Sequence, residues 1–169
     1  NMQGTLSATQ DQIAWVLTSY IVAAAIATPA TGWLASIMGR RRLLLVAIAG
    51  FTVASVLCGM ATSIGAMVAF RLLQGLFGAS LVPLSQSTLL DVYPREKHGA
   101  AMAMWGMGVM IGPILGPPLG GWLTDSYGWH WLFLINVPIG ALALFGVAAS
   151  LPTDDTHRTR FDWRGFAFL

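Results

Sequence analysis

The stretch GMGVMIGPILGPPLGG, residues 106–121, decides the fold class of this 169-residue chain. Glycine and proline fill nine of its sixteen positions, although both residues are poor helix formers in water. Met, Val, Ile and Leu fill the rest, and no charged residue occurs from Gly99 to Leu123. About 20 helical residues cross the hydrocarbon core of a bilayer. We therefore predict a membrane helix that carries an unusual density of helix breakers.

The whole chain has the composition of a membrane protein, because it is 56% hydrophobic and only 9% charged. Soluble domains carry about 25% charged residues. We expect an all-α integral membrane protein that is a piece of a longer one. A membrane bundle is predicted over residues 1–151, with spans at residues 12–39, 43–63, 66–90, 99–123 and 131–151. Residues 152–162 are predicted to form a cytoplasmic linker, and residues 163–169 the start of a further transmembrane helix.

The basic residues predict the orientation of these spans. All of them except Arg71 lie in alternate connections, at residues 40–42, 95–97 and 158–164. Membrane proteins keep such Lys- and Arg-rich loops in the cytoplasm. We therefore expect a multi-pass protein of the cytoplasmic (inner) membrane with these three connections inside the cell.

Four glycines in the quoted stretch form a ridge at a four-residue spacing. Gly108, Gly112, Gly116 and Gly120 leave a strip about 18 Å long without side chains on one helix face. Such strips allow a second helix to approach closely in lipid. Three prolines of the same stretch (Pro113, Pro117 and Pro118) each remove a backbone donor. Static packing explains the glycines alone, whereas glycines and prolines together favour a bent helix at a moving interface.

Arg71 is the only charged residue well inside a predicted span. A central arginine costs about 2.5–3.5 kcal/mol in membrane insertion. Its helical face continues with small and polar residues, which suit the wall of a cavity: Gln74, Gly75, Gly78 and Gln86. The alternative is that Arg71 extends to the lipid headgroups. We favour a functional arginine.

Several segments resemble one transporter family in the order that the family has them. GVMIGPILGPPLGG resembles the antiporter motif of the major facilitator superfamily, GWLASIMGRRRL its signature loop, and RLLQGLFGA its helix-four pattern. WHWLFLINVPIG and FDWRGF resemble the entries of helices six and seven in fourteen-helix drug:proton antiporters of the EmrB type. The resemblance implies part of the N-terminal half of a major-facilitator bundle, covering helices two to six and the start of seven.

The resemblance also implies functions for individual residues. Arg71 is expected to take part in proton coupling with an acidic residue of helix one. The antiporter motif maps to Gly108, Gly112, Pro113, Gly116, Pro117, Gly120 and Gly121, and the cytoplasmic gate loop to Gly32, Gly39, Arg40 and Arg41. Ser36 and Ile37 depart from the family pattern, which has an aspartate and a basic residue there. Weaker candidates for the cavity wall and substrate contact are Gln74, Gly75, Gly78, Gln86, Trp105 and Asn136.

The expected function is proton-coupled export of lipophilic or cationic drugs. Protons are the coupling ion, and no other cofactor, metal or nucleic acid is expected. Possible partners are a membrane-fusion adaptor and an outer-membrane channel. The three histidines lack metal-ligand spacing, and the glycines follow no strand, so we expect no enzyme. Alternatives are a facilitator-type transporter of another small solute, such as an organic anion or a sugar, a passive channel or receptor, and a structural membrane subunit.

Overall fold

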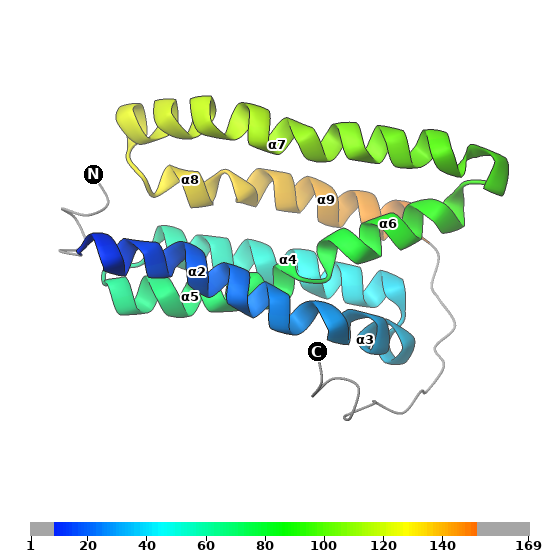
Figure 1. Ribbon diagram of the computed structural model, residues 1–169, viewed down its shortest axis with the longest axis horizontal. Coiled ribbons are helices and arrows are strands. Elements are labelled where there is room, and N and C mark those ends of the chain that lie inside the picture. The colour runs from blue at the N-terminus through cyan, green and yellow to red at the C-terminus, as the bar shows by residue number, and fades with distance from the viewer. Residues whose placement is uncertain (1–8, 152–169) are drawn as a thin grey trace.

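The computed structural model describes residues 9–151, and this part of the chain contains helices but no strand. Its elements, labelled in Figure 1, are α2 (Gln10–Ala27), η1 (Thr28–Ala30), α3 (Thr31–Met38), α4 (Arg40–Gly59), α5 (Ile64–Gly78), α6 (Leu81–Val92), η2 (Arg95–Lys97), α7 (His98–Tyr127), α8 (Trp131–Leu134) and α9 (Asn136–Ser150). The all-α fold class is therefore confirmed. The predicted linker and the further helix lie outside the described residues.

Five helical segments of the described chain are long and apolar enough to cross a membrane. They are Gln12–Met38, Arg40–Gly59, Ile64–Val92, Arg95–Tyr127 and Trp131–Ser150. Figure 1 shows their long axes running along the length of the molecule. The connections with basic residues 40–42 and 95–97 lie at one end, and the α4–α5 and α7–α8 connections lie at the other. This arrangement agrees with a multi-pass membrane protein.

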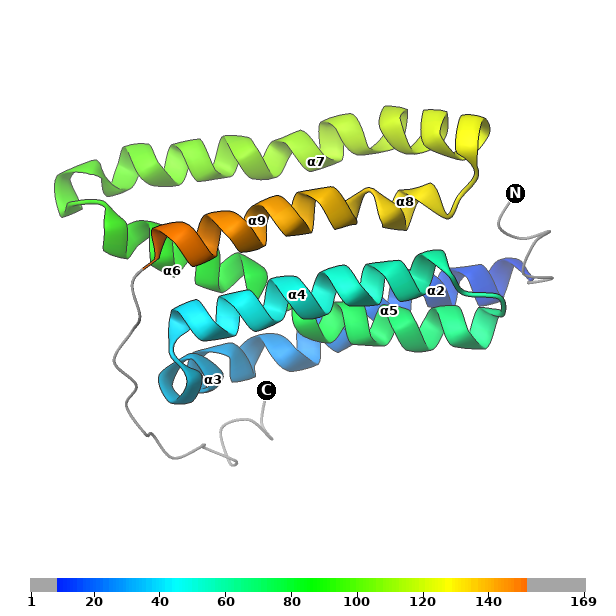
Figure 2. The ribbon, with the colours of Figure 1, turned by 180° about the vertical axis from the view of Figure 1, so that it is seen from behind.

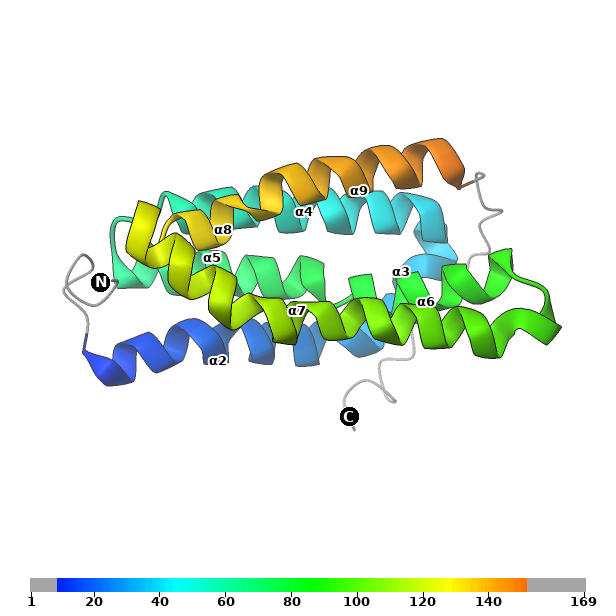
Figure 3. The same ribbon diagram turned by 90° about the horizontal axis from the view of Figure 1, so that it is seen from above.

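Three of the five spans are divided, which the sequence analysis does not foresee. Each division lies beside a single proline: Pro29 in η1, Pro83 near the start of α6, and Pro138 near the start of α9. Proline lacks an N–H and its ring displaces the carbonyl four residues earlier, so the helix changes direction there. By contrast, α7 runs without interruption through its three prolines. Seen from above, it changes direction in its yellow-green half (Figure 3).

A close contact between α2 and α5 depends on Gly75. A Cβ atom at this position would collide with the backbone carbonyl oxygen of Tyr20. The α4–α9 pair, which lies side by side in Figure 2, is similar, because a Cβ atom at Gly140 would collide with the Thr52 side chain. Small residues therefore set the distances between these helices, as is common in membrane bundles.

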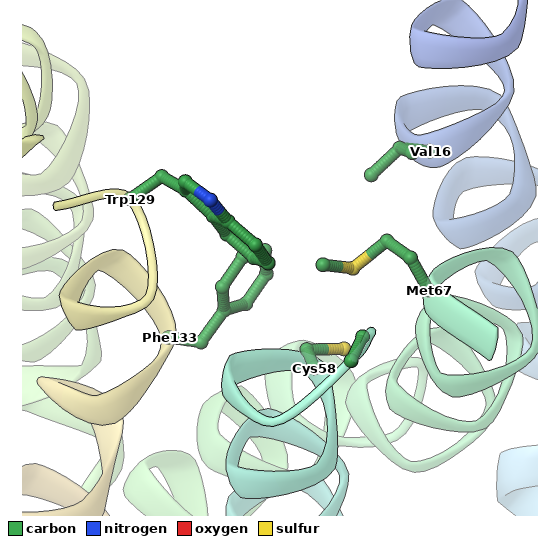
Figure 4. Packing of buried hydrophobic residues seen from close by; sticks show 6 residues of the cluster. Val16, Cys58, Met67, Trp129 and Phe133 are labelled. Atoms are coloured by element: carbon green, nitrogen blue, oxygen red, sulfur yellow. The ribbon is translucent and has the colours of Figure 1, made fainter. Parts of the chain in front are cut away.

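Two apolar clusters hold the helices together. The first lies near the α4–α5 connection and combines residues from α2, α4, α5 and the α8 region: Val16, Cys58, Ala61, Met67, Trp129 and Phe133. Figure 4 shows Trp129 and Phe133 facing Met67 and Cys58. The second cluster lies toward the opposite end and contains Leu43, Leu44, Ile48 and Leu84. α7 contributes to neither cluster and lies at the edge of the bundle against α6 and α8 (Figure 1).

Candidate functional site

Arg71 lies two turns into α5, where its half-buried side chain reaches α2. Its Nε atom donates a hydrogen bond to the backbone carbonyl oxygen of Val16 at 3.1 Å. Its Nη1 atom donates to Oε1 of Gln74 at 2.9 Å. The guanidinium group is therefore held by fixed partners within the bundle and does not extend freely toward the headgroups.

Two aromatic rings flank the same guanidinium group. Its Cζ atom lies 5.0 Å from the ring centroid of Tyr20 on α2 and 5.6 Å from that of Phe133 on α8. Both distances are within the range of cation–π attraction, which is stronger for desolvated cations. Arg71 thus connects α2, α5 and α8 at one point.

The partners of Arg71 within residues 9–151 are all neutral. They comprise a backbone carbonyl, a side-chain amide and two rings. An arginine in a membrane interior is usually paired with an acid or faces water. The described residues supply no carboxylate to this guanidinium group, so the pairing of Arg71 with an acid stays a prediction.

A polar chain continues from Arg71 into two further helices. Gln74 donates through Nε2 to Oγ of Ser55 on α4 at 2.5 Å. Asn136 on α9 donates through Nδ2 to the same Oγ atom at 3.2 Å. Gln74 and Ser55 are both buried. Ser55 is not among the residues predicted from the sequence, although a polar residue within an apolar span is a signal for a helix–helix hydrogen bond.

Two of the predicted cavity residues come together. Trp105 and Asn136 line one mainly apolar cavity of about 390 Å³ between α4, α6, α7 and α9. The Trp105 indole N–H donates to Oγ of Ser85 at 3.1 Å. This cavity is suited to apolar groups and has few polar atoms to fix their orientation.

The remaining cavity candidates lie elsewhere. Gln74 is buried between α5 and α4, and Gly75 packs on the backbone of Tyr20. Gly78 lies beside the rings of Tyr20 and Phe51. Gln86 is half-buried on α6. Their contact with a substrate stays a prediction.

The glycine ridge on α7 has almost no neighbours within the described chain. A Cβ atom at Gly108, Gly112, Gly116 or Gly121 would meet nothing within 4 Å, and one at Gly120 would meet only Leu132. The nearby side chain of Ile114 is 66% exposed. Pro113 and Pro117 lie in the same uncovered part of α7. The close helix contact expected along this ridge therefore stays a prediction.

The predicted gate loop is the turn between α3 and α4. Gly39 has a φ angle of 82° there, which residues with side chains rarely adopt. Arg40 forms an ion pair with Asp91 on α6, and Arg41 donates through Nη2 to the carbonyl oxygen of Ala148 on α9 at 2.8 Å. Gly32 lines a cavity of about 630 Å³ beside this loop. The turn thus contacts the ends of two other spans.

Ser36 occupies the position where the family pattern has an aspartate. Its hydroxyl group donates to the carbonyl oxygen of Trp33 on its own helix at 2.7 Å. It lines the same 630 Å³ cavity as Gly32. The anionic part of the usual gate loop is therefore replaced here by a neutral hydroxyl group.

Comparison with known proteins agrees with this geometry. The chain is 51% identical over 137 residues to the multidrug export protein EmrB of Haemophilus influenzae, a match that covers 81% of this chain and 27% of that protein. It is 43% identical over 168 residues to EmrB of Escherichia coli strain K12, covering 98% of this chain and 33% of the relative. The fatty acid resistance protein FarB of Neisseria gonorrhoeae is 42% identical over 168 residues, with the same coverage of 98% and 33%.

The chain thus spans no more than 33% of the length of these relatives. The family model of the Major Facilitator Superfamily matches residues 1–165, which is nearly the whole chain. That match agrees with the five membrane-spanning segments and with the motifs of α5 and α7. This chain belongs to the Major Facilitator Superfamily.

Proposed function

We propose that this chain forms part of a proton-coupled transporter that exports lipophilic or cationic drugs across the cytoplasmic (inner) membrane. The observation that carries the proposal is Arg71, a membrane-embedded cation whose partners in residues 9–151 are all neutral. A static bundle gains nothing from such a costly group. A proton-coupled transporter uses such a cation beside its proton-carrying acid. Arg71 therefore supports a transporter and not an enzyme.

The proposed coupling acts between Arg71 and a carboxylic acid outside residues 9–151. A guanidinium group favours the ionised form of a nearby carboxylate and so promotes release of its proton. Protonation of the acid removes this attraction and frees the helices that carry the two groups to separate. The proton is the only coupling ion in this scheme, and no other cofactor is proposed.

The substrate class follows from the cavity and from the relatives. The cavity of about 390 Å³ is mainly apolar, with Trp105 and Asn136 in its wall. An apolar pocket with an aromatic ring binds lipophilic cations through burial and cation–π attraction. Two of the most similar relatives are named multidrug export proteins. These two points support drugs as the substrates.

A second candidate substrate is an amphipathic organic anion such as a fatty acid. The support is that FarB, named as a fatty acid resistance protein, is 42% identical over 98% of this chain. A fatty acid has the apolar chain that such a cavity accepts, and its carboxylate is attracted to a cation such as Arg71. Nothing in the described geometry supports a sugar, which needs many hydrogen-bond partners.

The test uses the complete protein in everted membrane vesicles with an imposed proton gradient. Tetraphenylphosphonium is added as the drug, and release of protons is followed with a pH-sensitive dye. We expect release by the native protein and none by Arg71→Ala. The matched control is Arg42→Ala, the same substitution at an exposed position in the first turn of α4, which should release protons as the native protein does.

Each outcome has a defined meaning. Equal release by native protein and Arg71→Ala would remove Arg71 from the coupling. Release with oleate but not with tetraphenylphosphonium would favour the fatty acid over the drug. No release with either compound, while the protein is inserted and folded, would overturn proton-coupled export. Co-purification with a membrane-fusion adaptor and an outer-membrane channel is the corresponding test of the proposed partners.

A further inference from the structure

Three helices share one hydrogen-bond chain that begins at Arg71 and ends at Asn136. Arg71 donates to Oε1 of Gln74 at 2.9 Å, and Gln74 donates to Oγ of Ser55 at 2.5 Å. Asn136 donates to the same Ser55 oxygen at 3.2 Å. The chain therefore runs from α5 through α4 to α9.

The charge of Arg71 fixes the direction of this chain. A guanidinium group has five N–H donors and no acceptor, so only the carbonyl oxygen of the Gln74 amide can face it. The NH₂ group of the amide must then point the other way, toward Ser55. Reversing the amide would place two donors against each other and would remove the donor from Ser55.

Ser55 is the acceptor on which both amides depend. A hydroxyl oxygen has two lone pairs, and here one accepts from Gln74 and the other from Asn136. Ser55 is fully buried and Gln74 is 2% exposed, so water has no access to replace the bond between them. Loss of this one oxygen leaves the buried amide donor of Gln74 without its partner, which is unfavourable.

The far end of the chain reaches the cavity between α4, α6, α7 and α9. Asn136 is in the wall of that cavity, whereas Ser55 and Gln74 are not. One turn along α9, Gly140 packs directly on Thr52 of α4. A shift of α9 or of the Asn136 amide therefore changes the Asn136–Ser55 hydrogen bond first and the Ser55–Gln74 hydrogen bond second.

We infer that Gln74 and Ser55 are positioning residues that hold the Arg71 guanidinium group in place, and that Asn136 connects this hold to the cavity. Occupation of the cavity changes the Asn136–Ser55 bond and, through the Gln74 amide, the position of the arginine. This inference rests on the proposed function, because it assigns the route by which substrate and proton sites communicate.

The test compares two measurements on the complete protein. One is proton release on addition of tetraphenylphosphonium in everted vesicles, and the other is binding of the same cation without a gradient. Ser55→Ala should lower proton release about tenfold, the scale of one lost buried hydrogen bond, while the binding constant stays within about twofold. Ser87→Ala is the matched control, because that hydroxyl donates only within its own helix, to Leu84, and both readouts should stay native.

Gln74→Glu separates positioning from simple packing. The substitution keeps the size of the side chain but places a carboxyl group beside Arg71, whose charge favours the ionised form, and this carboxylate competes with the acid of the coupling pair. We expect binding to persist and proton release to be lost. Combining Ser55→Ala with Asn136→Leu should lower proton release per bound cation no further than Ser55→Ala alone, because residues that act through one chain are not additive.

Native proton release in Ser55→Ala or in Gln74→Glu would overturn the inference while leaving the proposed function intact. Additive losses in the double variant would overturn the connection to Asn136. Loss of binding together with release would reduce Ser55 to a structural residue, which also overturns it. Absence of release from the native protein would instead count against the proposed function itself.

Discussion

Arg40, the first residue of α4, forms an ion pair with Asp91, the penultimate residue of α6. The neighbouring Arg41 donates to Ala148, close to the end of α9. Two consecutive arginines thus attach the α3–α4 turn to the ends of two different spans. This turn belongs to the predicted gate loop, so the attachment gives that loop a definite geometry at the end of the bundle that carries residues 95–97.

Breaking the ion pair should have a small effect on stability. The two side chains are 46% and 58% exposed, and exposed pairs contribute about 0–1 kcal/mol. Asp91→Asn is therefore expected to lower the unfolding free energy in detergent by less than about 1 kcal/mol. The difference from the native protein should vanish in 1 M salt, where charges are screened beyond roughly 3 Å. The control is Glu96→Gln, a change at an exposed acid on η2. A larger loss of unfolding free energy in Asp91→Asn that persists in 1 M salt would show that the pair acts as a buried one.

The turn itself should be far more sensitive than the ion pair. Gly39 combines a φ of 82° with a ψ of 148°, a region that is essentially restricted to glycine. Gly39→Ala should cost about 1–3 kcal/mol and should misplace Arg40 and Arg41. Gly32→Ala is the matched control, because Gly32 lies within α3 and a Cβ atom there meets nothing within 4 Å. Equal melting temperatures of the two variants would contradict this account of the turn.

The α2–α5 contact offers a third test. Gly75→Ala places a methyl group into the backbone of Tyr20, and overpacking of this kind typically costs about 1–3 kcal/mol. Gly65→Ala lies on the same helix with nothing within 4 Å of its Cβ position, so it should be neutral or should stabilise the helix by about 0.5–1 kcal/mol. Unfolding of the complete protein in detergent measures both. If Gly75→Ala is as stable as Gly65→Ala, the two helices do not approach as closely as described.

The sequence predicts the fold class and the position of Arg71 for one physical reason. A long uncharged segment is stable in the bilayer, and a charge within it is costly there. Both effects depend on that segment alone and not on its neighbours. The breaks beside Pro29, Pro83 and Pro138 are different. Proline weakens a helix locally, but its presence does not decide whether the helix is interrupted, because the three prolines of α7 leave that helix continuous.

Ser55 could not be identified from sequence because its importance depends on three-dimensional pairing. It is one hydroxyl residue among several in apolar spans, and most of the others donate to their own helix, as Ser87 does to Leu84. Only the placement of α4 between α5 and α9 brings Gln74 and Asn136 to its oxygen. Similarly, the sequence predicts Asn136 at a cavity wall, where the structure places it, but not its bond to Ser55; its contact with a substrate stays a prediction.

The α7 glycine ridge leads to a prediction that separates folding from transport. No described atom lies within 4 Å of a Cβ position at Gly112, so Gly112→Leu should leave the described bundle intact, with an unfolding free energy within about 1 kcal/mol of native. Transport should fall at least about tenfold, because a leucine on the ridge prevents close approach of a second helix during the cycle. Efflux of tetraphenylphosphonium and thermal unfolding of the complete protein provide the two readouts.

The control for this prediction is Gly99→Leu, which adds the same side chain to the same helix. Gly99 also has nothing within 4 Å of its Cβ position, but it lies near the start of α7 and outside the four-residue series. Its transport should stay native. If both variants lose transport equally, any large side chain added to α7 impairs transport, and the ridge has no special role. If neither variant loses transport, the ridge faces lipid throughout the cycle. A loss confined to Gly112→Leu, with unchanged stability, means that the partner of the ridge lies beyond residues 9–151 and that their contact is part of the transport step.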